Sequence, residues 1–244
     1  MHHFELVPGK VFIKIYNKEF NASTHQYIPK KYPVEEILKN ISAVTEDLGA
    51  KSLAILNQVH GIKVVDADNI WAVGQEPEAD AMISMKNLRA LGVQTADCVP
   101  VLLASKNGKI IGAAHCGWRS AFGGVLEVLA QKMREKSDDK IVAVIGPSIQ
   151  QKSYEVDQNF YNNFLEKSEA YNQFFKKHLS EKYLFDLPAF VKFLLKNLDI
   201  EVVKHFNDDT YSNPELYPSY RYAMHNNISG GYKGSILSTI YISK

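Results

Sequence analysis

Residues 99–130, VPVLLASKNGKIIGAAHCGWRSAFGGVLEVLA, contain two short apolar runs followed by a longer amphipathic stretch. The runs at 99–105 and 109–115 have the length of strands, and the Lys-Asn-Gly sequence at 106–108 between them predicts a hairpin. Beyond this hairpin the apolar side chains recur every three or four positions, which predicts a helix over 120–136. Two adjacent strands that lead directly into an amphipathic helix indicate a sheet covered by a helix.

The rest of the chain also combines strand-length runs with longer helical patterns. Residues 33–48 have helical spacing, with a proline at the start and Gly49 as a stop signal. Residues 157–197 are rich in helical patterns. Further strands are expected at 10–16, 52–59, 63–65, 81–84, 91–96, 140–146, 201–206 and 235–242. Strands joined mostly by turns, then helices and a final strand, predict an α+β fold in which mixed β-sheets are layered with α-helices, in a single domain covering 1–244.

Composition and charge narrow the class of partner. The chain has 244 residues, of which 45% are hydrophobic and 23% charged, as in an ordinary soluble protein. It has 28 Lys and Arg against 27 Asp and Glu, a net charge of +1. Such a chain has no summed positive field to attract nucleic acid or an anionic membrane, so we expect neither as a partner. A small-molecule ligand is expected instead.

Targeting signals and cysteine content indicate the compartment. The first residues lack a charged segment followed by an unbroken apolar core, and no run reaches the roughly 18 apolar residues that a spanning helix needs. A cytoplasmic location is therefore expected. The two cysteines, Cys98 and Cys116, form no disulfide framework, which leaves both thiols available for a metal or for chemistry.

Side chains that can coordinate a metal occur where three of the expected strands end. His60 stands in NQVHG, Asp97 and Cys98 in TADCVPV, and His115 and Cys116 in AAHCGWR. Their separations along the chain match no short zinc motif, so residue type is the stronger signal. Two imidazoles and a thiolate suit zinc and leave a fourth tetrahedral position open, as catalytic sites do.

Each of these residues also has a purely structural interpretation. A histidine in a turn can be a hydrogen-bonded surface residue, and a cysteine beside Val99 and Pro100 can be a small buried hydrophobe. Trp118 can be a packing residue beside a surface Arg119, and Asp97 can cap a turn. Taken one at a time, these residues leave both interpretations open.

The motifs taken together resemble the signature blocks of the YfiH family, the laccase-domain proteins once called multicopper polyphenol oxidases. The matching blocks are NQVHG at 57–61, EADAMIS at 78–84, TADCVPVLL at 95–103, AAHCGWRSAFGGV at 113–125, and AVIGPSI with SYEV between 143 and 156. The resemblance implies an α+β fold and one zinc ion held by His60, Cys98 and His115. It also implies phosphorolysis of purine nucleosides (adenosine, inosine, guanosine and S-methyl-5′-thioadenosine) and deamination of adenosine in the same site.

Phosphorolysis needs a bound phosphate, for which the turn after the second strand of the hairpin offers candidates. Gly117 would let the backbone approach the anion, and the helix that begins near Arg119 would offer free N–H groups and its positive end. Arg119 would bind phosphate in bidentate fashion and completes, with the three metal ligands, the expected catalytic set. Cys116 is expected to pack in the core, because it points the opposite way from His115 in a strand.

The sequence raises three alternative functions, and it argues against the first of them. Copper-dependent oxidation of phenols needs several coppers, which one His–Cys–His set cannot hold. A zinc hydrolase acting on peptidoglycan precursors and a non-catalytic binding protein are the remaining alternatives. The binding protein would owe its lost turnover to the stretch IKIYNKEFNAS at 13–23, where the family usually has an arginine and a glycine pair.

Overall fold

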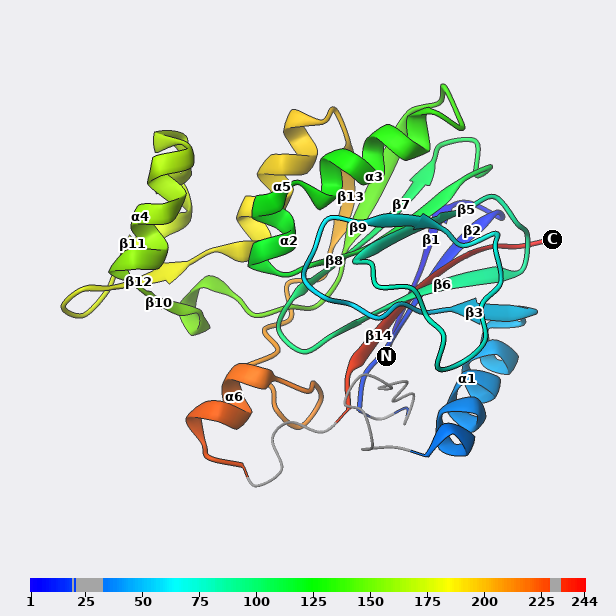
Figure 1. Ribbon diagram of the computed structural model, residues 1–244, viewed down its shortest axis with the longest axis horizontal. Coiled ribbons are helices and arrows are strands. Elements are labelled where there is room, and N and C mark those ends of the chain that lie inside the picture. Colours follow the sequence, from blue (N-terminus) through cyan, green and yellow to red (C-terminus); the bar gives the residue numbers. More distant parts are fainter. Residues whose placement is uncertain (19, 21–32, 229–233) are drawn as a thin grey trace.

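The computed structural model describes residues 1–18, 20, 33–228 and 234–244, and its ribbon is shown in Figure 1. It confirms the predicted α+β class with mixed sheets and covering helices. A five-stranded sheet has the order β1 (His2–Val7), β2 (Val11–Tyr16), β14 (Ile236–Ile242), β6 (Arg89–Thr95) and β3 (Ser52–Ala54). A six-stranded sheet has the order β13 (Glu201–His205), β9 (Ile141–Ile145), β7 (Val99–Ser105), β8 (Ile111–Cys116), β5 (Ala81–Ser84) and β4 (Val64–Asp66).

The two large sheets share a core, and helices cover the other face of the six-stranded sheet. In β7 the side chains of Leu102 and Ala104 pack between the sheets, whereas Val101 and Leu103 pack beneath the helices. This division follows from the alternation of side chains along a strand. Because both faces of β7 are covered, all its residues are buried and its sequence is a continuous apolar run.

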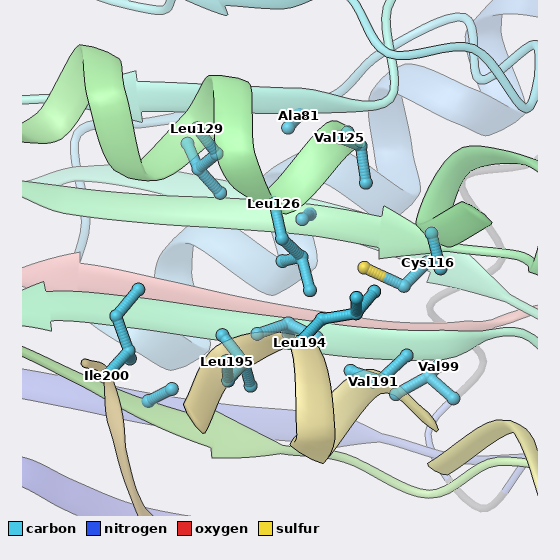
Figure 2. Packing of buried hydrophobic residues seen from close by; sticks show 14 of the residues in the cluster. Ala81, Val99, Cys116, Val125, Leu126, Leu129, Val191, Leu194, Leu195 and Ile200 are labelled. Atoms are coloured by element: carbon cyan, nitrogen blue, oxygen red, sulfur yellow. The ribbon is translucent and has the colours of Figure 1, made fainter. Parts of the chain in front are cut away.

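The helical layer consists chiefly of α3 (Val125–Arg134) and α5 (Leu187–Asn197). Figure 2 shows Leu126 and Leu129 of α3 beside Leu194 and Leu195 of α5 in this core. On the other side of the molecule, α1 (Val34–Leu48) packs on the five-stranded sheet. No helix among the described residues is both long and apolar enough to cross a membrane.

The hairpin is confirmed, but the single helix predicted over 120–136 is wrong. Helix α2 (Trp118–Gly123) begins earlier and ends at Gly124, and α3 begins directly after it. Gly124 has a φ of 105°, a left-handed conformation that glycine adopts without steric cost, so the chain turns there instead of continuing one helix.

The helix-rich prediction for 157–197 is only partly right. Helix α4 (Gln158–Lys167), the 3₁₀ turn η2 (Glu169–Phe174) and α5 are present, but β11 (Phe175–Lys177) and β12 (Lys182–Phe185) lie between them. These two strands form a three-stranded sheet with β10 (Glu155–Asp157), which follows the 3₁₀ turn η1 (Gln151–Ser153). Tilted and edge-on phenylalanine rings join this sheet to α4, and Figure 1 shows the unit at one end of the molecule.

Two departures from the sequence pattern shape the functional site. The strand expected at 52–59 ends at Ala54, so residues 55–59 leave the sheet as a loop. The short helix α6 (Tyr220–His225) was not predicted. Both segments line the cavity at His60, Cys98 and His115.

Candidate active site

His60, Cys98 and His115 come together from three parts of the fold. His60 lies in the loop between β3 and β4, Cys98 immediately precedes β7, and His115 lies in β8. Strands β7 and β8 pair so that Pro100 lies opposite His115, which places Cys98 beside the end of β8. The potential ligand atoms of the three residues all lie within 4.8 Å of one another, and Cys98 Sγ is 3.8 Å from His60 Nε2.

Asp80, which immediately precedes β5, holds both histidines in place. Its carboxylate accepts hydrogen bonds from the backbone N–H groups of Val59 (3.2 Å), His60 (2.9 Å) and Gly61 (2.6 Å). It also accepts one from Nδ1 of His115 at 2.8 Å, which leaves Nε2 of that ring for a metal. His60 has a φ of 59°, so the carboxylate supports a left-handed turn that presents the imidazole. Asp80 is fully buried, and sequence reasoning missed it, although it lies in the quoted EADAMIS block.

The charges in this cluster favour a thiolate. Burial alone would raise the pKa of the Cys98 thiol, but the neighbouring imidazoles of His115 and His60 outweigh burial and lower the pKa to about 6. Burial would likewise lower the pKa of His115, but Cys98 and Asp80 raise it. The cluster therefore has thiolate character at neutral pH, which is the form of cysteine that binds metals.

Gly117 is required by the crowding of the ligands. A Cβ atom at this position would lie 2.7 Å from Cδ2 of His60 and 3.1 Å from Sγ of Cys98. Both distances are below ordinary contact, so any side chain would push the two ligands apart. The space that Gly117 leaves is thus taken up by the side chains of His60 and Cys98, which is a different reason for the glycine from the expected approach of the backbone to phosphate.

The cluster opens into a cavity of about 700 Å³ that is bounded by both apolar and cationic side chains. The apolar part includes Trp118, Ile149, Tyr154, Leu187 and Met224. The cations are Arg119, which sequence reasoning singled out, and Arg221 of α6, which it missed. A cavity of this size with a few polar groups is typical of a site for a small organic ligand.

Arg119 lies at this cavity without a carboxylate partner among the described residues. Its guanidinium carbon is 4.6 Å from the centre of the Trp118 ring, and the side chain is exposed. The expectation that the helix end contributes to anion binding is weakened, because α2 has only 6 residues. Any anion at this end of the cavity would interact chiefly with the guanidinium.

Asp97 and Cys116 have structural roles. Asp97 has a φ of 94°, and its carboxylate accepts hydrogen bonds from Oγ1 of Thr210 and from the backbone N–H of Arg221, both at 2.7 Å. It therefore fixes the segment that carries α6 against the strand end beside Cys98. Cys116 is fully buried, and Figure 2 shows its sulfur facing into the core beneath the helices, as expected.

Only part of the N-terminal stretch at 13–23 belongs to the described structure. Strand β2 includes its first residues, and Phe20 packs against the Tyr16 ring at a centroid distance of 4.8 Å. Positions 19 and 21–23 lie outside the described residues.

Comparisons with known proteins identify relatives that cover nearly the whole of this chain. The chain is 46% identical over 239 residues to a purine nucleoside phosphorylase of Rickettsia conorii, covering 96% of this chain and 98% of that protein. It is 43% identical over 240 residues to a purine nucleoside phosphorylase of Rickettsia prowazekii, covering 97% and 98%.

Two solved structures share the fold. A Neisseria meningitidis protein, NMB0706, superimposes with a TM-score of 0.83 at 27% identity and covers 100% of this chain and 99% of its own. The Bacillus licheniformis YfiH protein superimposes with a TM-score of 0.80 at 19% identity, covering 96% and 93%. The family described as multi-copper polyphenol oxidoreductase laccase matches residues 12–243. Fold, sequence and motif order agree, and the chain belongs to this laccase-like YfiH family.

Proposed function

We propose that the protein is a zinc-dependent purine nucleoside phosphorylase that also deaminates adenosine in the same site. Its substrates would be adenosine, inosine, guanosine and S-methyl-5′-thioadenosine, together with phosphate. The observation that carries the proposal is the convergence of His60, Cys98 and His115 at a cavity that also contains Arg119, for which the described residues provide no carboxylate partner. The names of the relatives support the same reaction. The proposal includes one zinc-binding domain over 1–244 and a cytoplasmic location.

The donor set suits zinc. Ligand distances of about 2.0–2.1 Å for nitrogen and 2.3 Å for sulfur put the donors of a tetrahedral site roughly 3.3–3.6 Å apart. The 3.8 Å between Cys98 Sγ and His60 Nε2 needs only a small closure to match. A bound zinc would supply a Lewis acid for an oxygen atom of a substrate. Among the described residues this is the one such cluster of potential metal ligands, too few for the several coppers of a multicopper oxidase.

The chain's own side chains would position the reactants. In phosphorolysis an oxygen of phosphate forms a bond to C1′ of the ribose while the C1′–N9 bond breaks, so that the purine leaves with the electron pair. Arg119 would hold the phosphate next to the ribose, and the apolar wall near Trp118 and Tyr154 would bind the base. Deamination uses water at C6 of adenine and releases ammonia, so it needs no phosphate.

Product analysis tests this proposal. Zinc-loaded protein is incubated with adenosine in the presence or absence of phosphate, and adenine, inosine and hypoxanthine are separated. Adenine and ribose 1-phosphate should form only with phosphate, whereas inosine should form without it. His115→Ala should abolish both reactions, and Arg119→Ala should reduce phosphorolysis selectively. Loss of one reaction alone in His115→Ala would contradict the single site, and inactivity of the zinc-replete protein on every purine nucleoside would contradict the proposal.

A further inference from the structure

Arg221 is the second guanidinium at the cavity, and three residues from two parts of the chain fix its position. Its backbone N–H donates to Asp97 at 2.7 Å, and its Nη1 donates to the backbone carbonyl of Glu155 at 2.9 Å. The guanidinium carbon lies 5.1 Å from the centre of the Tyr154 ring. Unlike Arg119, this residue is half-buried, so its side chain is already ordered before any ligand binds.

Most of the hydrogen-bonding capacity of Arg221 is unused. A guanidinium has five N–H donors, and the described residues accept from one of them, through the carbonyl of Glu155. No carboxylate in the described part of the chain forms an ion pair with Arg221 or with Arg119. The nearby carboxylate of Asp97 is already engaged by Thr210 and by the backbone of Arg221. The two arginines therefore bring two cations without ion-pair partners among the described residues to the wall of one cavity, and the charge of Asp97 acts on one of them, Arg221.

Tyr154 links the two arginines. Burial raises the pKa of its hydroxyl, and Cys98 raises it further, whereas the positive charges of both Arg221 and Arg119 act in the opposite direction. The guanidinium of Arg221 lies over the Tyr154 ring, and Arg119 lines the same cavity. Its hydroxyl donates to none of the described residues, so it too is available to a ligand.

We propose that Arg221 is a phosphate-binding residue, which together with Arg119 forms a two-arginine clamp for a phosphate dianion. This inference deepens the proposed function and rests on it for the identity of the anion. Two guanidiniums match the two charges of the dianion, and each can donate a pair of parallel hydrogen bonds to its oxygens. Because Arg221 is already held in place, it loses less conformational freedom on binding than Arg119, so we assign it the larger share of the affinity.

Direct phosphate binding, measured without nucleoside, tests the clamp. The zinc-loaded protein is titrated with inorganic phosphate by calorimetry, and Arg221→Gln and Arg221→Lys are compared with the wild type. Glutamine should raise the phosphate Kd by about tenfold or more, since hydrogen bonds to a charged group are lost. Lysine should restore part of the affinity, because it keeps the charge but not the planar fork. Nucleoside binding without phosphate should change less than about twofold.

A matched control separates the clamp from general effects of removing an arginine. Arg134 of α3 donates to a backbone carbonyl, that of Leu198, as Arg221 does to Glu155, but it does not line the cavity. Arg134→Gln should leave phosphate binding unchanged. The substitutions at 221 keep the backbone N–H that donates to Asp97, and thermal unfolding in phosphate-free buffer shows whether each variant is folded.

The outcomes for the clamp and for the proposed function are distinct. Wild-type protein that binds phosphate through Arg221 but cleaves no nucleoside would support the clamp and contradict phosphorolysis. A phosphate Kd within about twofold of wild type in folded Arg221→Gln would overturn the clamp even if phosphorolysis occurs. Absence of phosphate binding in the zinc-loaded wild type would overturn it as well.

Discussion

Replacing Asp80 with asparagine is expected to disturb the placement of the two histidines that its carboxylate supports, His60 and His115. The carboxylate accepts four hydrogen bonds, three from the backbone at 59–61 and one from Nδ1 of His115. An asparagine side chain has one acceptor oxygen, and its NH₂ group would face N–H donors. At least one side of the carboxylate's network must therefore break, either the turn that presents His60 or the bond that orients the His115 ring.

The expected loss in metal affinity follows from the contacts that Asp80 makes. Removing one hydrogen-bond partner of a metal ligand typically weakens metal binding by about 10- to 100-fold. Because Asp80 supports two of the three proposed ligands, we expect the upper end, roughly 100-fold, which corresponds to about 2.7 kcal/mol of binding free energy. The full burial of Asp80 argues for this larger value, since water cannot replace the lost acceptor.

Competition with a chromophoric zinc chelator measures this loss, and unfolding in the presence of chelator measures the stability of the metal-free protein. Asp68→Asn is the matched control, because Asp68 accepts hydrogen bonds from Ser84 Oγ (2.5 Å) and Met85 N (3.3 Å) at the opposite end of β5. The control should lose stability but keep its zinc affinity. Zinc affinity within about threefold of wild type in folded Asp80→Asn would refute the positioning role.

Three further predictions concern other parts of the structure. Gly117→Ala should lose zinc affinity with little loss of metal-free stability, because its Cβ would lie 2.7 Å from Cδ2 of His60; equal zinc titration curves for variant and wild type would contradict this. Elemental analysis should find about one zinc per wild-type chain and much less in Cys98→Ala; full zinc in that variant would remove the cysteine from the ligand set. Burial would raise the pKa of Asp47, but the hydrogen bonds from Lys14 and Tyr16 outweigh burial and lower it. The ionised Asp47 therefore stabilises the fold above the ordinary carboxyl pKa, and this stabilisation is lost as the pH falls through the lowered pKa of the folded state. Asp47→Asn should be less stable than the wild type at pH 7, and the difference in stability should shrink in acid. A stability difference that does not depend on pH would contradict this.

The central strands were predictable because burial dictates their composition. Strands β7 and β8 are covered on both faces, so their sequences are mostly apolar and stand out from the turn between them. Helix α1 was equally clear, since one face is buried and Gly49 ends it in a left-handed conformation. The break between α2 and α3 was less visible, because the apolar spacing continues across Gly124 and only its φ of 105° shows the turn.

Long-range contacts explain what the sequence did not reveal about the site. Asp80 acts on residues from two distant segments, and its neighbours in β5 identify it only as the residue before a buried strand. Helix α6 is too short to show a periodic pattern, and it reaches the cavity because Asp97 bonds to Thr210, 113 positions away, and to Arg221. The motifs of the family supplied His60, Cys98 and His115, whereas the second arginine emerges only from the folded arrangement.

The register of the β7–β8 hairpin also decides which side chains form the proposed metal-ligand set. His115 and Cys116 are adjacent in β8 and point to opposite faces, so pairing Pro100 with His115 directs the imidazole to the cavity and the thiol to the core. A slip of one residue would exchange them and present two thiols and one imidazole, a donor set that also suits zinc. Gly108, with a φ of 70°, and Ser105, whose hydroxyl accepts from the backbone N–H groups of 109 and 110, fix the turn against that slip. A tight turn far from the cavity therefore maintains the proposed ligand set, because a one-residue shift of the register would replace His115 by Cys116 among the ligands.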